Sequence, residues 1–422
     1  MELGPNGKAN FTWSMIGTVC ESALNFVLLI VVNRVVGETL GGIYTLAFSH
    51  AQLMYFVATL ESRPIHSTDV KQKYRFADYF TLRIITCLLM MAVSLGYVLW
   101  MDADPLKKHV MLYMCAFKAV DALFDVFACM YQQHDRIEFS GKVSTVKICV
   151  EMIVFVSVLL LTRNLEYASL AMVAASLAVL FTYNLRKWRL FEDARIELRF
   201  DKVTEILLAS LPLFVSVFVL NYISNAPKYA INTYCTDVVQ NRYSILFMPA
   251  FAINVMCQFV MRPMLTPMAR MWNNGRVGDF RKNILKLMAL VGCVTVLAVG
   301  AAWLLGIPVL NLLYGVDLWE DRIVLVWVMV YGGLSAVNIF LYDMIAVTRR
   351  QQWLLGAYLI AATAVFFLAP ALVRSAAMTG AIRASILSLA LLDVLLVGII
   401  AQVIRKAKPE NAAAASGDGA KG

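Results

Sequence analysis

Ionisable side chains inside long apolar stretches are the residues of this sequence that could do chemistry. Lys118, Asp121 and Asp125 follow one another at spacings of three and four in one apolar stretch, and Lys147 and Glu151 lie four apart in the next. In a helix these spacings bring the side chains onto one face. A charge in the hydrocarbon zone of a membrane is costly and usually functional. The two stripes therefore predict either buried ion pairs or a site that handles ions and anionic groups, and both interpretations stay open.

Further polar residues lie within or beside other apolar stretches. Glu21 and Asn25 are four apart in the first stretch, and Pro227 is predicted to break a helix because it lacks a backbone donor. The remaining candidates are Arg34, Asn221, Asn225 and Lys228, with Arg63, Arg83 and Arg262 at the inner ends of stretches. Arg34, Lys228 and Arg262 could instead snorkel to lipid headgroups. Asp343 and Asp393, in the second half, are expected to make contacts between helices.

The elements that must position these residues are membrane-spanning helices. The chain is 60% hydrophobic and 15% charged, whereas soluble domains are nearer half apolar and a quarter charged. Continuous apolar blocks of about 20 residues predict α-helices, because lipid leaves no other partner for the backbone. Twelve blocks are expected, at residues 11–35, 42–60, 78–100, 109–131, 141–161, 167–185, 203–224, 239–261, 284–306, 322–347, 352–372 and 376–403.

Charge outside these blocks predicts the topology. Lys and Arg concentrate in alternate connecting segments, so both termini are expected in the cytoplasm. The formal net charge of +9 is thereby explained by loops beside lipid headgroups, and no nucleic-acid partner is expected. The eight cysteines and four histidines form no motif with metal-ligand spacing, so no metal is expected.

The blocks fall into two sets of six with a similar rhythm. We expect a six-helix bundle over residues 1–185, a cytoplasmic linker over 186–202, a second bundle over 203–408 and a disordered tail over 409–422. Six helices in each half would give parallel repeats. The expected extramembrane segments are too short for a soluble domain, so the chain is not expected to be an enzyme.

Several segments resemble bacterial polysaccharide flippases of the Wzx type, within the multidrug/oligosaccharidyl-lipid/polysaccharide (MOP) exporter superfamily. The resemblance lies in residues 63–64, 67–71, 73–80 and 83–86, in Lys118, 121–126, 131–133, Arg136 and 141–142, and in 225–231, 247–250, 262–263 and 265–266. It implies an all-α, MATE-like, V-shaped transporter of two six-helix bundles around a central cavity. It also implies a multi-pass protein of the bacterial cytoplasmic (inner) membrane.

The same resemblance implies a substrate. Such proteins move undecaprenyl-diphosphate-linked oligosaccharides from the inner to the outer leaflet, by alternating access and without an organic cofactor. The lipid-linked oligosaccharide, the bilayer and other polysaccharide-assembly proteins would be the partners. Arginine and lysine suit a diphosphate, so Arg34, Lys118, Lys147 and Lys228 would bind it, with Arg63, Arg83 and Arg262 at the inner rim. Asn25, Asn221 and Asn225 would bind the sugar.

The acidic residues Glu21, Asp121, Asp125 and Glu151 do not suit a diphosphate. They would neutralise the lysines of an empty site or couple transport to H⁺ or Na⁺. They also keep open a second function, a drug or cation antiporter of the same superfamily. A membrane-embedded glycosyl polymerase or ligase is a third class, and the short external segments argue against it.

Overall fold

A computed structural model describes residues 7–69, 73–134, 137–184, 199–348 and 353–417. The chain divides into two compact units, Met1–Asn221 and Tyr222–Gly422. Regular structure in the described residues is helical, and each of the twelve expected blocks falls on helical segments. Seven of the described helical segments are long and apolar enough to cross a membrane. The predicted all-α, polytopic membrane architecture is thus confirmed.

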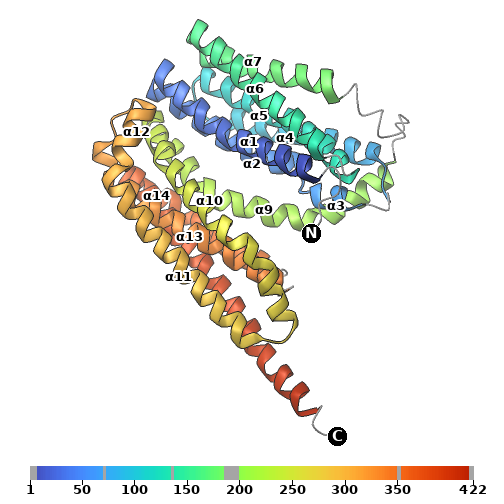
Figure 1. Ribbon diagram of the computed structural model, residues 1–422. Helices are drawn as coiled ribbons and strands as arrows, with labels where there is room; N and C mark the ends of the chain where they lie inside the picture. Colours follow the sequence, from blue (N-terminus) through green and yellow to red (C-terminus); the bar gives the residue numbers. More distant parts are fainter. Residues whose placement is uncertain (1–6, 70–72, 135–136, 185–198, 349–352, 418–422) are drawn as a thin grey trace. The chain divides into compact units, whose positions relative to one another are not determined.

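Unit 1 is built around helix α5. Its helices are α1 (Gly7–Val36), α2 (Glu38–Thr59), the short α3 (Arg63–Thr68), α4 (Phe76–Trp100), α5 (Pro105–Gln133), α6 (Ile137–Thr162) and α7 (Leu165–Val179), which a π-helical turn (Leu180–Asn184) continues. Helix α5 contacts α2, α3, α4, α6 and α7 (Figure 1). The charged stripe of α5 is therefore surrounded by protein, which lets partners on other helices neutralise it.

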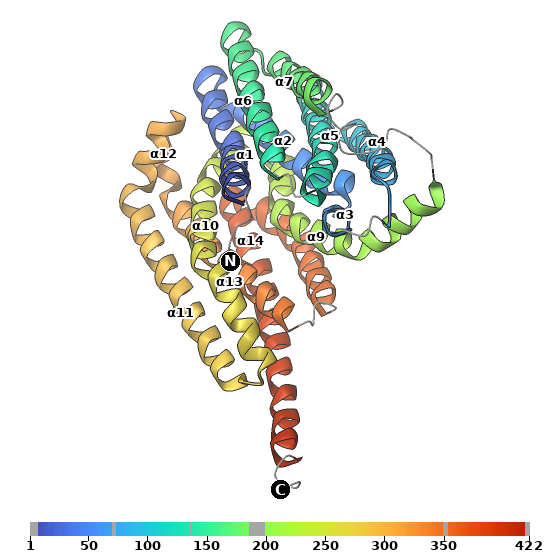
Figure 2. The same cartoon turned by 45° about the vertical axis from the view of Figure 1, so that its right-hand side comes forward.

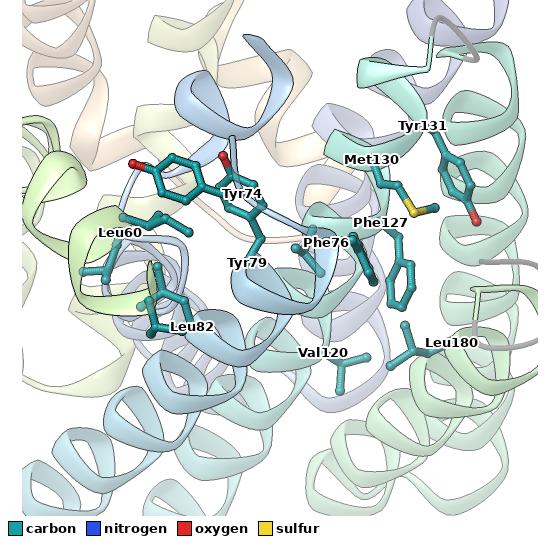
Figure 3. Close-up of a cluster of buried hydrophobic side chains, with 13 residues drawn as sticks. Leu60, Tyr74, Phe76, Tyr79, Leu82, Val120, Phe127, Met130, Tyr131 and Leu180 are labelled. Carbon is teal, nitrogen blue, oxygen red and sulfur yellow. The ribbon is translucent and has the colours of Figure 1, made fainter. Parts of the chain in front are cut away.

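Helix α9 (Phe200–Tyr234) begins in unit 1 and ends in unit 2. Val203 and Ile206, from its first turns, belong to a buried apolar cluster with Leu60, Tyr74 and Phe76 (Figure 3). Two ion pairs, Arg199 with Asp78 and Glu205 with Lys73, add to this contact. The division between the two compact units falls inside α9. Residues 186–198 of the expected linker lie outside the described part, so the linker stays a prediction.

The helix break predicted at Pro227 is wrong. Helix α9 continues through Pro227 to Tyr234. Proline removes one backbone donor, yet spanning helices tolerate this loss when neighbouring groups satisfy the freed carbonyl. Pro227 is itself buried.

Unit 2 contains the second part of α9 and four long helical segments. They are α10 (Asp237–Asn273), α11 (Val277–Ala301) continued by a π-helical turn (Ala302–Gly306) and α12 (Ile307–Tyr314), α13 (Arg322–Val347) and α14 (Leu354–Gly417). Helix α13 packs against α10, α11 and α14, so it lies in the interior of this unit (Figure 2). Polar side chains on α13 can therefore reach several helices.

Helix α14 is two helices joined at a sharp bend. Ala376 and Ala377 have non-helical backbone angles, and Ala377 has φ 45°. This bend separates the two expected blocks 352–372 and 376–403. The second helix extends to Gly417, and residues 418–422 of the tail expected over 409–422 lie outside the described part. The alanine-rich run at 412–415 favours helix because alanine has the highest helix propensity.

Gly380 allows the bend to close, and replacing it should destabilise the protein. A Cβ at this position would lie 1.9 Å from the carbonyl oxygen of Leu372. We expect Gly380→Ala to lower the free energy of unfolding by about 3 kcal/mol or more, because backbone must move. Gly398→Ala, on the same helix with open space around the added carbon, is the control. It should be neutral or stabilising by up to about 1 kcal/mol. Thermal melting of both purified variants in detergent gives the comparison, and equal melting temperatures would contradict it.

Candidate functional site

Asp125 on α5 is the centre of one buried ionic group. Its Oδ1 accepts from Arg63 Nη1 at 2.6 Å and its Oδ2 from Arg83 Nη2 at 3.0 Å. Arg83 leaves only 2% of its side chain exposed. Arg83 also donates to the carbonyl of Ala58 at 3.1 Å and to Ser62 Oγ at 3.3 Å. Asp125 therefore anchors the arginine that ties α4 to the end of α2.

The turn after α2 depends on this anchor. Leu60 and Glu61 both have left-handed backbone angles, with φ of 48° and 50°. Residues other than glycine adopt this region at an energetic cost. The bonds from Arg83 to both sides of the turn offset that cost and direct α3, with Arg63 at its start, towards α5.

Asp121, one turn earlier on α5, is the centre of a second ionic group. Its carboxylate accepts from Lys118 Nζ at 2.8 Å and also pairs with Lys147 Nζ from α6. Lys147 lies 3.4 Å from Glu151, and Glu151 in turn accepts a hydrogen bond from Ser176 on α7. A single carboxylate thus bridges two lysines that come from different helices.

Aromatic rings surround the two ammonium groups. The Nζ of Lys118 lies 5.2, 5.7 and 5.2 Å from the ring centroids of Phe48, Tyr55 and Phe117. The Nζ of Lys147 lies 5.6 and 5.1 Å from those of Phe117 and Phe124. Cation–π attraction of this kind is strongest where water is excluded, and the lysine side chains are only 8% and 10% exposed. The rings therefore act together with Asp121 to hold the two ammonium groups in place.

The other predicted residues of unit 1 lie outside the ion pairs centred on Asp121 and Asp125. Glu21 and Arg34 on α1 are exposed, and Asn25 is half-buried. Its Oδ1 is buried without a hydrogen-bond partner. Asn221 donates its amide to the carbonyl of Val217 in its own helix, at 2.9 Å. Neither exposed charge belongs to the ion pairs centred on Asp121 and Asp125.

The predicted residues of unit 2 are Asn225, Lys228 and Arg262. Asn225 and Lys228 are half-buried on the second part of α9. Arg262 lies on α10, and its side chain is outside the described part. The ionic groups of unit 1 therefore contain Arg63, Arg83, Lys118, Lys147, Asp121, Asp125 and Glu151 from the predicted set.

Two residues of this region carried no signal in the sequence. Ser176 sits in an ordinary apolar stretch, and only the packing of α7 on α6 brings it to Glu151. His66 on α3 stacks on Tyr79 with ring centroids 3.9 Å apart. Burial, with the nearby positive charges of Arg83 and Arg63, lowers the pKa of His66 to about 3. His66 is therefore neutral near pH 7 and packs as an aromatic ring.

The described ranges contain no group of three or more His, Cys, Asp or Glu side chains that could hold a metal ion. The two ionic groups of unit 1 consist of ammonium, guanidinium and carboxylate groups. Together they can exchange protons, exchange partners or bind an anion.

The fold is that of the MATE transporters of the MOP superfamily. One solved relative is a multidrug resistance MATE transporter in an inward-facing conformation, with a TM-score of 0.68 and 11% identity over 95% of this chain and 98% of that one. The Vibrio cholerae transporter VcmN in its bent form matches with a TM-score of 0.57 and 11% identity, over 95% and 97%. A MOP superfamily transporter from Pyrococcus furiosus matches with a TM-score of 0.56 and 14% identity, over 95% of this chain and 96% of that one.

The third of these structures is described as having a binding pocket of reverse polarity that suggests a different function. No protein-family model and no curated protein matches this sequence. Identities this low establish the shared fold alone, so the cargo must be argued from the residues of this chain.

Proposed function

We propose that this chain is a flippase that moves an undecaprenyl-diphosphate-linked oligosaccharide from the cytoplasmic to the outer leaflet of the bacterial cytoplasmic membrane. The observation that carries the proposal is the bridge in which Asp121 joins Lys118 and Lys147. Two buried ammonium groups that converge on one carboxylate can also converge on a phosphate. A diphosphate offers more oxygens and more negative charge than the carboxylate, so it can take the place of Asp121.

Arg63, which is expected at the cytoplasmic rim, is a second residue suited to a diphosphate cargo. Its guanidinium is held by Asp125 at 2.6 Å and by Gln132 Oε1 at 3.3 Å, yet half of the side chain is exposed. A guanidinium held in position loses little conformational freedom when it binds phosphate. Arg63 would therefore make the first contact with the headgroup, and Arg83 would act as a positioning residue for it. Proteins that assemble the polysaccharide would supply and remove the cargo.

The second candidate is a MATE-type drug or cation antiporter. It is favoured by the solved structures of this fold, which include multidrug resistance transporters, and by the carboxylates of Asp121, Asp125 and Glu151 in the buried ion pairs of unit 1. In that function Asp121 would exchange its lysine partners for a proton or a cation. Two buried lysines beside it weaken this alternative, because they repel a cationic drug.

Complementation distinguishes the two candidates. The wild-type chain is expressed in a flippase-null bacterium supplied with a cognate lipid-linked oligosaccharide, and in a drug-sensitised strain. We expect surface polysaccharide to return in the first strain and drug resistance to stay unchanged in the second. Membrane fractions confirm that the protein is present in both. Resistance without surface polymer would replace the flippase proposal by the antiporter.

A further inference from the structure

Helix α2 leaves one narrow stripe of side chains partly uncovered. Over residues 41–59 of this helix every residue is buried except Phe48, Gln52, Tyr55 and Phe56. Phe48, Gln52 and Tyr55 are spaced four and three residues apart, so they lie on one face. Helix α2 packs on α1, α4 and α5. The stripe is therefore the part of its surface that these neighbours do not cover completely.

The stripe lies beside the two bridged lysines. The Nζ of Lys118 on α5 is 5.2 Å from the ring centroid of Phe48 and 5.7 Å from that of Tyr55. Gln52 lies between these two rings on the helix face, which places it close to the same ammonium group. Asp121 joins Lys118 to Lys147. A group linked directly to a phosphate held by the two lysines would therefore meet the stripe.

Two side chains of the stripe have polar groups that the described residues do not use. Within the described ranges, neither the amide of Gln52 nor the hydroxyl of Tyr55 makes a hydrogen bond, and both side chains are only half-buried. A carboxamide and a phenol can each donate and accept. The stripe consequently offers two aromatic rings, with polar groups between and beside them, to a ligand that has both apolar faces and hydroxyls.

We propose that Phe48, Gln52 and Tyr55 bind the hexopyranose that is joined to the diphosphate of the cargo, an inference that rests on the proposed function. A pyranose ring carries C–H groups on its faces, which pack on aromatic rings, and hydroxyls at its edge, which pair with a carboxamide. Sites for small ligands combine apolar and aromatic walls with a few polar groups that fix the orientation. The first sugar is the one within reach, because it is bonded to the diphosphate between Lys118 and Lys147.

This site changes which residues select the sugar. Asn221 is among the residues expected to bind it, yet its amide is used within its own helix. Gln52 carried no signal in the sequence, since it is a single amide in an apolar run, and only the packing of α2 on α5 brings it beside Lys118. Gln52 is thus a specificity-determining residue, whereas the two lysines bind the diphosphate of any cargo.

Binding of two lipids to the purified full-length protein in detergent tests the sugar site. The probes are undecaprenyl diphosphate and the same lipid with one glucose joined to its diphosphate. The wild type should bind the glucose-bearing lipid about 10- to 100-fold more tightly, through ring stacking and one or two hydrogen bonds. Gln52→Met and Tyr55→Leu should each lose most of this preference, and both should bind the bare lipid as the wild type does.

Phe366→Leu is the control, because it removes an exposed ring from α14 and should keep the wild-type preference. Phe48→Leu removes the other ring of the stripe, so it tests the site even if Tyr55→Leu folds poorly, which melting temperatures report. It should also lose most of the preference for glucose. Variants that lose both lipids equally would overturn the sugar site, because the stripe would then support only the fold or the headgroup.

The wild type separates failure of the sugar site from failure of the proposed function. Equal binding of the two lipids would overturn the sugar site and leave the diphosphate site in place. Binding of neither lipid would overturn the proposed function, and the sugar site with it. Ethidium binding that Tyr55→Leu abolishes, without any preference for the glucose-bearing lipid, would overturn the sugar site and assign the stripe to the drug antiporter.

Discussion

Replacing Asp125 by alanine should lower the free energy of unfolding by about 3–5 kcal/mol, the range for removing one member of a buried ion pair. Asp125 is the partner of Arg63 and of the almost completely buried Arg83. Without it, Arg83 retains its charge and loses its counter-charge. The left-handed turn at Leu60 and Glu61 then also loses the anchored side chain that holds it. Thermal melting and the yield of folded protein in detergent measure the loss.

Asp279→Ala is the matched control for this prediction. Asp279 pairs with Arg276 at 2.7 Å, but the two side chains are 49% and 65% exposed. Exposed pairs of this kind contribute about 1 kcal/mol or less. A double variant, Arg83→Met with Asp125→Leu, should recover much of the lost stability, because apolar residues replace the whole buried pair. An Asp125→Ala protein as stable as Asp279→Ala would contradict the central role of Asp125.

Removing the two bridged lysines should abolish transport while leaving the fold intact. The triple variant Lys118→Met, Asp121→Asn and Lys147→Met is made in a Glu151→Gln background, because removing the lysines alone would leave Asp121 and Glu151 charged and buried. Each hydrogen bond to a charged group contributes about 1.5–3 kcal/mol. Removing two such hydrogen bonds should lower the affinity for the diphosphate by about two to four orders of magnitude. Surface polysaccharide in the flippase-null strain should then disappear.

Lys107→Met with Lys108→Met is the control for the triple variant. These lysines lie half-exposed near the beginning of α5, so the control removes the same number of lysines, both of them away from the bridge at Asp121. It should restore surface polysaccharide as the wild type does, at equal abundance in the membrane. If the triple variant also restores it, the bridged lysines do not bind the cargo and the proposed anion site is wrong.

The helices and the contacts within each helix were predictable from the sequence. Apolar runs long enough to span a bilayer are a local property of the chain, and all twelve fall on helical segments. The pairs Lys118–Asp121 and Lys147–Glu151 follow from helical spacing, and the structure contains both. The resemblance to MOP exporters agrees with the observed fold, while the Wzx-type cargo stays a proposal.

Contacts between helices were not predictable in this way. Asp121 with Lys147, Asp125 with Arg63 and Arg83, and Asn338 with Asp393 each join different helices. The partners of Asp125 are 62 and 42 residues away along the chain. Helical spacing specifies which face a side chain occupies, but not which neighbouring helix that face meets. The rotation and depth of each packed helix determine this, and they depend on the side chains of the whole unit at once. The same packing keeps α9 helical through Pro227, where the local chemistry of proline favours a break.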